Sequence, residues 1–331
     1  MVMRDFIKIF PNQIDDAVKI GESIVMNTDF STIDNIVIGG QGGSGIGGVI
    51  VKNLLRDKMC KPIFINQDYA LPSFVNENTL FIASSYSGNT EETINALKQA
   101  QDRNSVIMCI CSGGEILEIA KKHNYDHVII PGGGAPRAML CYSIVQLLFI
   151  LSAVNGSSKS ELKQELIDVK SYLMSQQSAI VSLATQTVET MANKMPFIYA
   201  FPEFEGVALR FKQQLNENSK QHASCNLIPE MNHNEIVGWR NKHMCAIPIF
   251  LDGSSSERNK QRLRINMQQI NVCVDDIIHL SIDGVSYLHQ YFYFIHLVDW
   301  VSLILAEKNN FDPDEIDAIH YLKNELKKNS K

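Results

Sequence analysis

Short apolar runs alternate with amphipathic segments along the first 154 residues of the chain. The runs have the length and the β-branched content of buried strands, and the segments between them repeat apolar residues at helical spacing. Strands are expected at residues 35–38, 62–65, 80–84, 106–111 and 127–130, and helices at residues 5–27, 49–57, 91–102, 115–123 and 138–154. This alternation predicts a parallel, doubly wound sheet with helices on both faces.

A second series of the same kind follows a long helical pattern. Ser158 and Glu161 have capping-box spacing, and apolar residues recur at helical spacing behind them, so a connecting helix is expected at about 159–192. Beyond it, strands are expected at residues 196–200, 245–251 and 279–282, and helices at residues 205–221, 255–270, 286–307 and 315–328. We therefore expect two α/β domains, residues 1–154 and 155–331. Their similarity lies in the order of the elements, because no residue-by-residue repeat is visible.

The polar stretch Ser84–Thr93 lies between an expected strand and an expected helix. Free backbone N–H groups and the positive end of the helix dipole suit an anion there, and the hydroxyls of Ser85, Ser87 and Thr90 would add donors. The same residue types cap helices that bind nothing, and the stretch contains no lysine or arginine. The pattern alone leaves phosphate binding and structural capping both open.

Glycine occupies seven of the ten positions 39–48, directly after the first expected strand. Gly40, Gly42 and Gly45, with Asp68 after the next strand, match a dinucleotide-binding fingerprint. Such a match arises almost automatically in a run so rich in glycine. The alternative is a glycine-lined loop at a strand end, where backbone can approach one of many ligands.

Two polar clusters in the second half could carry acid–base chemistry. Residues 216–218 place Glu217 between two asparagines where a helical pattern ends, and residues 229–235 place His233 among amides and carboxylates in an expected loop. A carboxylate and a histidine that converge on one pocket would act as general base and general acid, whereas the alternative is ordinary surface solvation. Neither a metal-binding frame nor a nucleophile elbow is present in the sequence, so no metal is expected.

Composition excludes several functional classes. The chain has 331 residues, 45% of them apolar and 20% charged, and a formal net charge of −6, so it offers no basic surface for nucleic acid or an anionic membrane. Seven cysteines without metal-ligand spacing indicate small buried side chains in a reducing compartment. Because no apolar targeting or membrane-spanning run is evident, we expect a cytoplasmic protein.

Taken together, several of these motifs resemble those of the bifunctional phosphoglucose/phosphomannose isomerases of archaea and some bacteria, a branch of the sugar-isomerase (SIS) domain superfamily. The motifs are Gly39–Gly48, Ser84–Thr93, Pro136–Arg137, Leu215–Asn218 and Pro229–Glu235. The resemblance covers nearly the whole chain in order. It implies two tandem three-layer α/β/α domains and a homodimer with shared active sites. It also implies interconversion of glucose 6-phosphate and fructose 6-phosphate, and also of mannose 6-phosphate, through a cis-enediolate without cofactor or metal.

The resemblance also assigns roles to individual residues. Glu217 matches the base that moves the C2 proton, and Arg137 matches an arginine at the reacting carbons. His233 matches a histidine supplied by the partner subunit, which together with Lys323 is associated with opening the sugar ring. The phosphate-binding and glycine-loop positions match Ser85, Ser87, Thr90, Gly42, Gly43 and Ser44.

The chain departs from the family pattern at three places. Gln41 and Gly45 replace the usual methionine and alanine of the glycine loop, which should alter packing more than chemistry. Asp314 follows Asp312-Pro313 where relatives often have threonine, in a region linked to accepting mannose phosphate, so the second substrate stays open.

Three rival functions share some of these features. The isomerase half of a glucosamine-phosphate synthase is expected to follow a glutaminase domain that begins with cysteine, whereas residue 2 is Val2. An NAD-dependent oxidoreductase would rest on the glycine fingerprint. A non-catalytic sugar-phosphate sensor would carry a basic DNA-reading segment, and none precedes residue 35.

Overall fold

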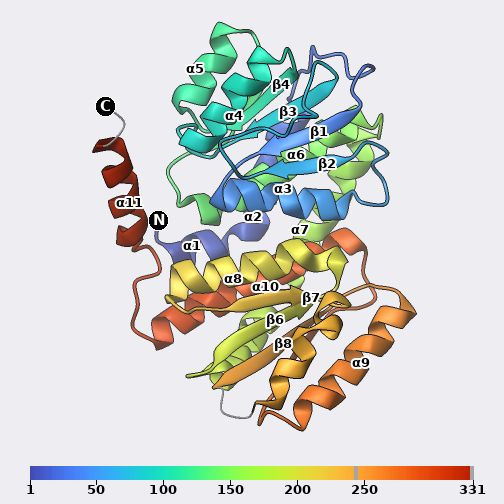
Figure 1. The fold of residues 1–331 in the computed structure, drawn as a ribbon, viewed down its shortest axis with the longest axis vertical. Helices are drawn as coiled ribbons and strands as arrows, with labels where there is room; N and C mark the ends of the chain where they lie inside the picture. Colours follow the sequence, from blue (N-terminus) through green and yellow to red (C-terminus); the bar gives the residue numbers. More distant parts are fainter. Residues whose placement is uncertain (242–244, 329–331) are drawn as a thin grey trace.

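The computed structural model describes residues 1–241 and 245–328, so residues 242–244 and 329–331 of the expected second domain lie outside the described residues. The chain forms two stacked units, each with a parallel sheet and covering helices (Figure 1). This confirms the expected α/β class.

The first sheet has five parallel strands in the order β2-β1-β3-β4-β5. Alternate residues of each central strand contribute to different cores. Ile36 and Ile38 of β1 face the same core as Ile110 of β4, whereas Val37 and Cys109 face the opposite one. The strand bounds are β1 (Asn35–Gly39), β2 (Ile63–Asn66), β3 (Thr79–Ser84), β4 (Val106–Cys111) and β5 (Asp126–Ile129).

Helices cover both faces of this sheet, as the alternation of strands and helices predicted. Helices α4 and α5 pack on one face, and α3 and α6 contribute to the core on the other. The bounds are α1 (Met3–Lys8), α2 (Phe10–Glu22), α3 (Gly42–Leu54), α4 (Glu91–Asp102), α5 (Gly114–Lys122), the 3₁₀ turn η1 (Pro136–Met139) and α6 (Leu140–Val154).

Two expected helices in this unit have different bounds. The helix expected over 5–27 is two helices, because Pro11 has no N–H to donate and therefore lies in the first turn of a new helix that ends at Glu22. The expected glycine loop is the beginning of α3, which starts at Gly42. Gly48 lets helix α3 approach β1 and β2 closely, because an added Cβ at this position would lie 3.1 Å from side-chain atoms of Ile38 and Ile65.

The second sheet has four parallel strands in the order β7-β6-β8-β9, which matches β2-β1-β3-β4 of the first. The similarity inferred from element order is therefore present in the strand order too. Strand β7 was not expected, because it is a half-buried edge strand with the mixed sequence Ser-Cys-Asn-Leu. The bounds are β6 (Met195–Ala200), β7 (Ser224–Leu227), β8 (Ala246–Asp252) and β9 (Ile278–Ser281).

The helices of the second unit also cover both faces of their sheet. Helices α8 and α10 face the first unit, whereas α9 packs on the far face with the short turns η3 and η4. The bounds are α7 (Lys159–Met191), η2 (Pro202–Phe204), α8 (Glu205–Ser219), η3 (Glu230–His233), η4 (Glu235–Arg240), α9 (Glu257–Asn271), α10 (Tyr287–Lys308) and α11 (Asp317–Lys328).

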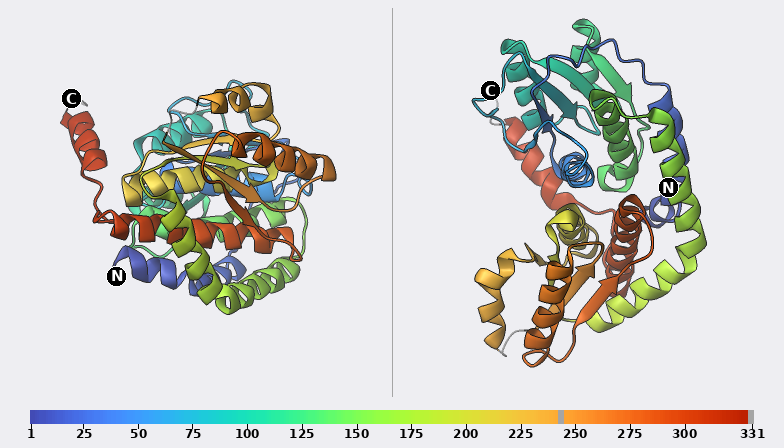
Figure 2. Two further views of the ribbon diagram at one scale, coloured as in Figure 1. Left: turned by 90° about the horizontal axis from the view of Figure 1, so that it is seen from below. Right: turned by 90° about the vertical axis from the view of Figure 1, so that its right-hand side faces the viewer.

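One hydrophobic core runs through both units. Helix α3 packs against α8, where an added Cβ at Gly206 would lie 2.7 Å from Ile50 Cγ1. The long helix α7 does more than connect the units, because Leu166, Leu173 and Val188 are buried in this core and the helix packs along α2 and α10 (Figure 2). Side chains from both units can therefore be held at fixed distances.

One helical stretch in the described residues, Pro136–Val154, is long and apolar enough to cross a membrane by composition. The protein buries 94% of that stretch, which is typical of a central core helix. Helix α11 is the opposite case, because none of its described residues is buried and it lies beside the body of the molecule (Figures 1 and 2).

The cysteines follow the expectation only in part. Cys109, Cys111 and Cys141 are buried, and burial raises the pKa of the Cys109 thiol to about 12. Cys60 and Cys245 are exposed instead, because each lies just outside a strand, where the chain passes over the surface.

Candidate functional site

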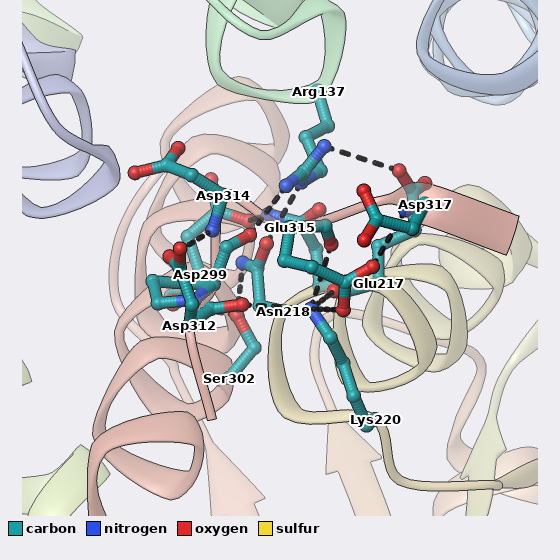
Figure 3. A network of polar contacts seen from close by, with 12 residues as sticks. Arg137, Glu217, Asn218, Lys220, Asp299, Ser302, Asp312, Asp314, Glu315 and Asp317 are labelled. Atoms are coloured by element: carbon teal, nitrogen blue, oxygen red, sulfur yellow. Dashed lines mark hydrogen bonds and ion pairs between the residues drawn. The ribbon is translucent and has the colours of Figure 1, made fainter. Parts of the chain in front are cut away.

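Arg137 joins the two units. It lies in η1 of the first unit, is 3% exposed, and directs its guanidinium at the end of α8 in the second (Figure 3). Its Nε donates to Asn218 Oδ1 over 2.8 Å, and its Nη1 donates to Glu217 Oε2 over 3.2 Å. Its Nη2 donates to the carbonyl oxygen of Pro313. The structure therefore places two of the expected site residues, Arg137 and Glu217, in direct contact.

The position of Glu217 needs nearby cations. Glu217 lies in the last turn of α8, where the negative end of the helix dipole disfavours a carboxylate. Arg137 offsets that cost from one side, and Lys220, just after the helix, offsets it from the other. The Glu217 side chain is 29% exposed, so it is held in place while one side remains open to solvent or a ligand.

The guanidinium of Arg137 has more donors than its contacts use. Its three hydrogen bonds use three of the five N–H groups of a guanidinium. Burial lowers the pKa of the Arg137 guanidinium, and the carboxylates of Glu217, Asp314 and Asp312 oppose this effect. An arginine stays charged at neutral pH even so, and it therefore offers a fixed positive charge beside Glu217.

The buried ion pair between Arg210 and Asp299 holds the backbone of Arg137 in place. Arg210 Nη2 lies 2.7 Å from Asp299 Oδ2 and also donates to the Arg137 carbonyl oxygen over 2.9 Å, while Gln214 Nε2 donates to Asp299 Oδ1. Burial raises the pKa of the Asp299 carboxyl, and Arg210 and Gln214 oppose the rise. Asp299 was not expected as a site residue, and the available signal was an acidic residue in the middle of the apolar, aromatic helix α10.

The segment 312–315 closes the site on another side. Besides the Pro313 carbonyl that binds Arg137, it contributes the carbonyl oxygens of Asp312 and Glu315, which both accept from Lys220 Nζ over 2.8 Å (Figure 3). Lys220 was not among the expected site residues, because a single lysine after a helix carries no distinctive pattern.

The serine-rich loop joins β3 to the start of α4. Ser85 Oγ and Thr90 Oγ1 are 2.8 Å apart. Thr90 is the N-cap residue of α4, and its side chain makes no hydrogen bond to the first amides of the helix. Ser87 is exposed. Gly88 has φ +67°, and an added Cβ there would lie 1.8 Å from the Gly113 carbonyl oxygen, so only glycine fits. The Ser87 hydroxyl is thus exposed close to the start of α4, whereas the Ser85 hydroxyl is buried and paired with that of Thr90.

The glycine-rich segment adjoins this loop. Ser44 Oγ accepts a hydrogen bond from the Tyr86 amide over 3.0 Å. An added Cβ at Gly43 would lie 3.1 Å from the Pro136 carbonyl oxygen, immediately before Arg137. The expected residues Gly42, Gly43 and Ser44 thus lie between the serine-rich loop and Arg137, at the start of α3.

Two glycines of the dinucleotide-binding fingerprint have close neighbours within the chain. An added Cβ at Gly40 would lie 2.7 Å from the Ser84 carbonyl oxygen, and one at Gly45 would lie 2.6 Å from the Gly40 carbonyl oxygen. These glycines are explained by contacts between chain segments. In the described residues no group of three or more His, Cys, Asp or Glu side chains is arranged to hold a metal ion.

In the part of the chain that the structure describes, no hydrogen bond or ion pair joins His233 or Lys323 to Glu217. Glu217 precedes β7, whereas His233 follows it, and a strand of four residues spans roughly 13 Å. His233 is exposed on η3, and Lys323 is exposed on α11.

The turn that carries His233 is nevertheless held firmly. Glu235 accepts hydrogen bonds from Tyr199 Oη over 2.7 Å and from Asn226 Nδ2 over 2.6 Å. Asn232 Nδ2 donates to Asn266 Oδ1. The polar residues on either side of His233 therefore anchor the turn, while the histidine itself faces outward from the chain's surface.

Comparisons with known proteins agree along almost the whole chain. Residues 29–154 match the SIS domain family, and residues 180–326 match the family described as bacterial phospho-glucose isomerase C-terminal SIS domain. The chain is 37% identical to the bifunctional phosphoglucose/phosphomannose isomerase of Caldicellulosiruptor bescii, over 96% of both proteins. It is 34% identical to the protein of the same name from Aquifex aeolicus, over 91% of this chain and 93% of that protein.

A solved structure extends the comparison to the fold. The C-terminal domain of glucosamine-fructose-6-phosphate aminotransferase from Francisella tularensis superposes with a TM-score of 0.78 at 16% identity, covering 95% of this chain and 98% of that one. The two-sheet architecture is therefore shared with proteins of other names, and the fold by itself does not distinguish among them.

Proposed function

The chain belongs to the family of bifunctional phosphoglucose/phosphomannose isomerases, and we propose that it interconverts fructose 6-phosphate with glucose 6-phosphate and with mannose 6-phosphate. The observation that carries this proposal is the 3.2 Å contact between Arg137 and Glu217, made across the two units. It supports the proposal because it holds a carboxylate, the proposed base, beside a fixed cation.

In the proposed mechanism Glu217 moves a carbon-bound proton. Isomerisation transfers hydrogen between C1 and C2 of the open-chain sugar, and the proton beside the carbonyl is acidic enough for a carboxylate to remove. The cis-enediolate that forms carries negative charge, which the two remaining N–H groups of Arg137 would stabilise. Return of the proton to C1 gives fructose 6-phosphate, and its return to C2 gives either aldose phosphate. This chemistry requires neither a metal nor a nucleotide.

The phosphate is proposed to bind to Ser85, Ser87 and Thr90 at the start of α4, with Gly42–Ser44 beside them. The helix start supplies amides and a favourable dipole, so a phosphate can be held without a lysine. Because the phosphate is distant from the reacting carbons, its binding energy would serve to hold C2 against Glu217.

We propose that the enzyme is a homodimer in which His233 enters the partner's site. The rigid turn around an exposed histidine supports this proposal, because a ligand-binding group that faces solvent in one chain can be completed by another. Helix α11 adds a second argument, since Ile319 and Leu322 share a helix face, are exposed, and need a cover in solution. Lys323 on this helix is proposed to assist His233 in opening the sugar ring.

Other parts of the proposal concern organisation and location. We place the division between domains at residues 154 and 155, because strands β1–β5 form one sheet and β6–β9 the other. The seven cysteines all lie in the described residues and none forms a disulfide, which accords with a reducing, cytoplasmic setting. A role in glycolysis or gluconeogenesis would follow from the proposed substrates.

Turnover of both aldose phosphates by one pure sample is the direct test. We expect glucose 6-phosphate and mannose 6-phosphate each to give fructose 6-phosphate, in the presence of a chelator and without added nucleotide. Turnover of glucose 6-phosphate alone would remove mannose phosphate from the proposal and would point to the segment with Asp314. Binding of fructose 6-phosphate without turnover would favour the sensor, and NADH binding would favour the oxidoreductase.

Replacing Ser87 with alanine is expected to raise KM for fructose 6-phosphate about tenfold and to change kcat less, because a hydrogen bond to a charged group far from the reacting carbons is lost. Steady-state kinetics would measure both constants. The inhibition constant of inorganic phosphate should rise by a similar factor, since that ion can use only the phosphate contacts. Ser87→Thr keeps the hydroxyl and is the matched control. A fall in kcat without a change in KM would move the loop to the reacting carbons.

A further inference from the structure

Lys220 has an unusual backbone conformation for its residue type. It follows α8 with φ 53° and ψ 30°, in the left-handed region that residues with a Cβ rarely adopt. Among the described residues, the other non-glycine positions with positive φ are all asparagine: Asn104, Asn124, Asn193 and Asn310. Asparagine tolerates this region better than lysine does. The lysine at position 220 is therefore explained by its side chain and not by its backbone.

The side chain of Lys220 is fully engaged. Its Nζ donates to the carbonyl oxygens of Glu217, Asp312 and Glu315, each over 2.8 Å, and three donors are all that an ammonium has. A lysine that only caps a helix would bind carbonyls of its own helix. Here two of the three acceptors belong to a segment more than 90 residues away.

These bonds complete a closed ring of contacts around the proposed base. Glu217 binds Arg137 through its carboxylate, and Arg137 binds the Pro313 carbonyl. Lys220 then joins the residues on both sides of Pro313 to the backbone of Glu217 (Figure 3). The ring links the first unit, the end of α8 and segment 312–315.

Charge makes the ring dependent on Lys220. Segment 312–315 contributes the carboxylates of Asp312, Asp314 and Glu315, and it lies against the negative end of the α8 dipole. The Lys220 ammonium also lies 3.6 Å from Glu315 Oε2. Without this cation, the segment and the helix end would repel one another, and the Pro313 carbonyl would lose its fixed position under Arg137.

We propose that Lys220 is a positioning residue that sets the relative placement of the Glu217 carboxylate and the Arg137 guanidinium. The inference rests on the proposed function of those two residues. Lys220 does not touch the reacting atoms, because its donors are used within the protein. It acts through Glu217 and Pro313, and it therefore matters for the rate of proton transfer more than for substrate affinity.

The variant Lys220→Asn tests this role with a matched backbone, because asparagine is the residue that the chain uses at its other left-handed positions. We expect kcat for fructose 6-phosphate to fall about tenfold to a hundredfold, because a small misplacement of reacting groups has effects of that size. We expect KM to change less than about threefold. The melting temperature should stay close to that of the wild type, since the better backbone preference offsets the lost hydrogen bonds. Lys220→Gly should behave in the same way.

Lys122→Asn is the control for loss of an ammonium at a helix end, because Lys122 is exposed in the last turn of α5. Its kcat should equal that of the wild type. If Lys220→Asn keeps kcat within twofold while its melting temperature falls, Lys220 is only a helix cap and the inference is overturned. If the wild type itself does not isomerise sugar phosphates, the proposed function fails, and the two failures are thus distinguished.

Discussion

Replacement of Glu217 by glutamine is expected to lower kcat for fructose 6-phosphate by about a hundredfold or more, because glutamine cannot accept the proton that the proposed base removes from C1 of the ketose. The amide has nearly the same size, and its oxygen can still accept a hydrogen bond from Arg137 Nη1, so the fold should persist. Exchange of a C1 hydrogen of fructose 6-phosphate with deuterated solvent should be lost together with turnover. Steady-state kinetics and NMR of the substrate would measure the two effects.

The control for this variant is its neighbour. Asn216→Ala changes an exposed residue on the same turn of α8 and should leave kcat unchanged. If Glu217→Gln keeps full turnover, Glu217 is not the base.

The same variant can test the shared site. The homodimer of His233→Ala should also be nearly inactive, although both of its active sites would still contain Glu217. If His233 crosses to the partner, a mixed dimer with Glu217→Gln contains one complete site, so an equal mixture should regain about a quarter of the wild-type rate after subunit exchange. A mixture that stays inactive after exchange would show that both residues serve the same chain's site.

Replacement of Arg137 by methionine is expected to lower kcat by about a hundredfold to a thousandfold, because the cation beside the developing enediolate is lost. It should also lower the free energy of unfolding by about 2–3 kcal/mol, since the buried Asn218 Oδ1 and the Pro313 carbonyl lose their donor. Kinetics and thermal unfolding would measure the two losses separately. At this position the proposed catalytic role and the contact between the two units depend on the same side chain.

Arg137→Lys separates these two roles. Lysine keeps the charge, but one ammonium cannot reach three acceptors that a planar guanidinium contacts in different directions. We expect it to recover much of the stability and little of kcat. If Arg137→Met lowers the stability but keeps kcat within tenfold, Arg137 holds the two units together and is not a catalytic residue.

The fold and the site were predictable to different degrees. The strands expected at 80–84 and 106–111 and the helix expected at 91–102 agree closely with β3, β4 and α4, because each has a clear local period of burial. Strand β7 was missed because an edge strand buries too little to show such a period. The start of α3 was misread as a loop because glycine has a poor helix propensity, which close packing against β1 and β2 overrides here.

The sequence by itself determined the two α/β series and the polar stretch between a strand and a helix at Ser85–Thr90, and through a family resemblance it predicted the residue types of the site. Only the tertiary structure decided that Arg137 contacts Glu217 and Asn218, that Asp299 supports it through Arg210, and that Lys220 ties segment 312–315 to the proposed base. The physical reason is that a hydrophobic period records which face of an element is buried, but not what it is buried against. A contact between residues 80 or more positions apart leaves no periodic trace in the chain, and it appears only when the elements pack.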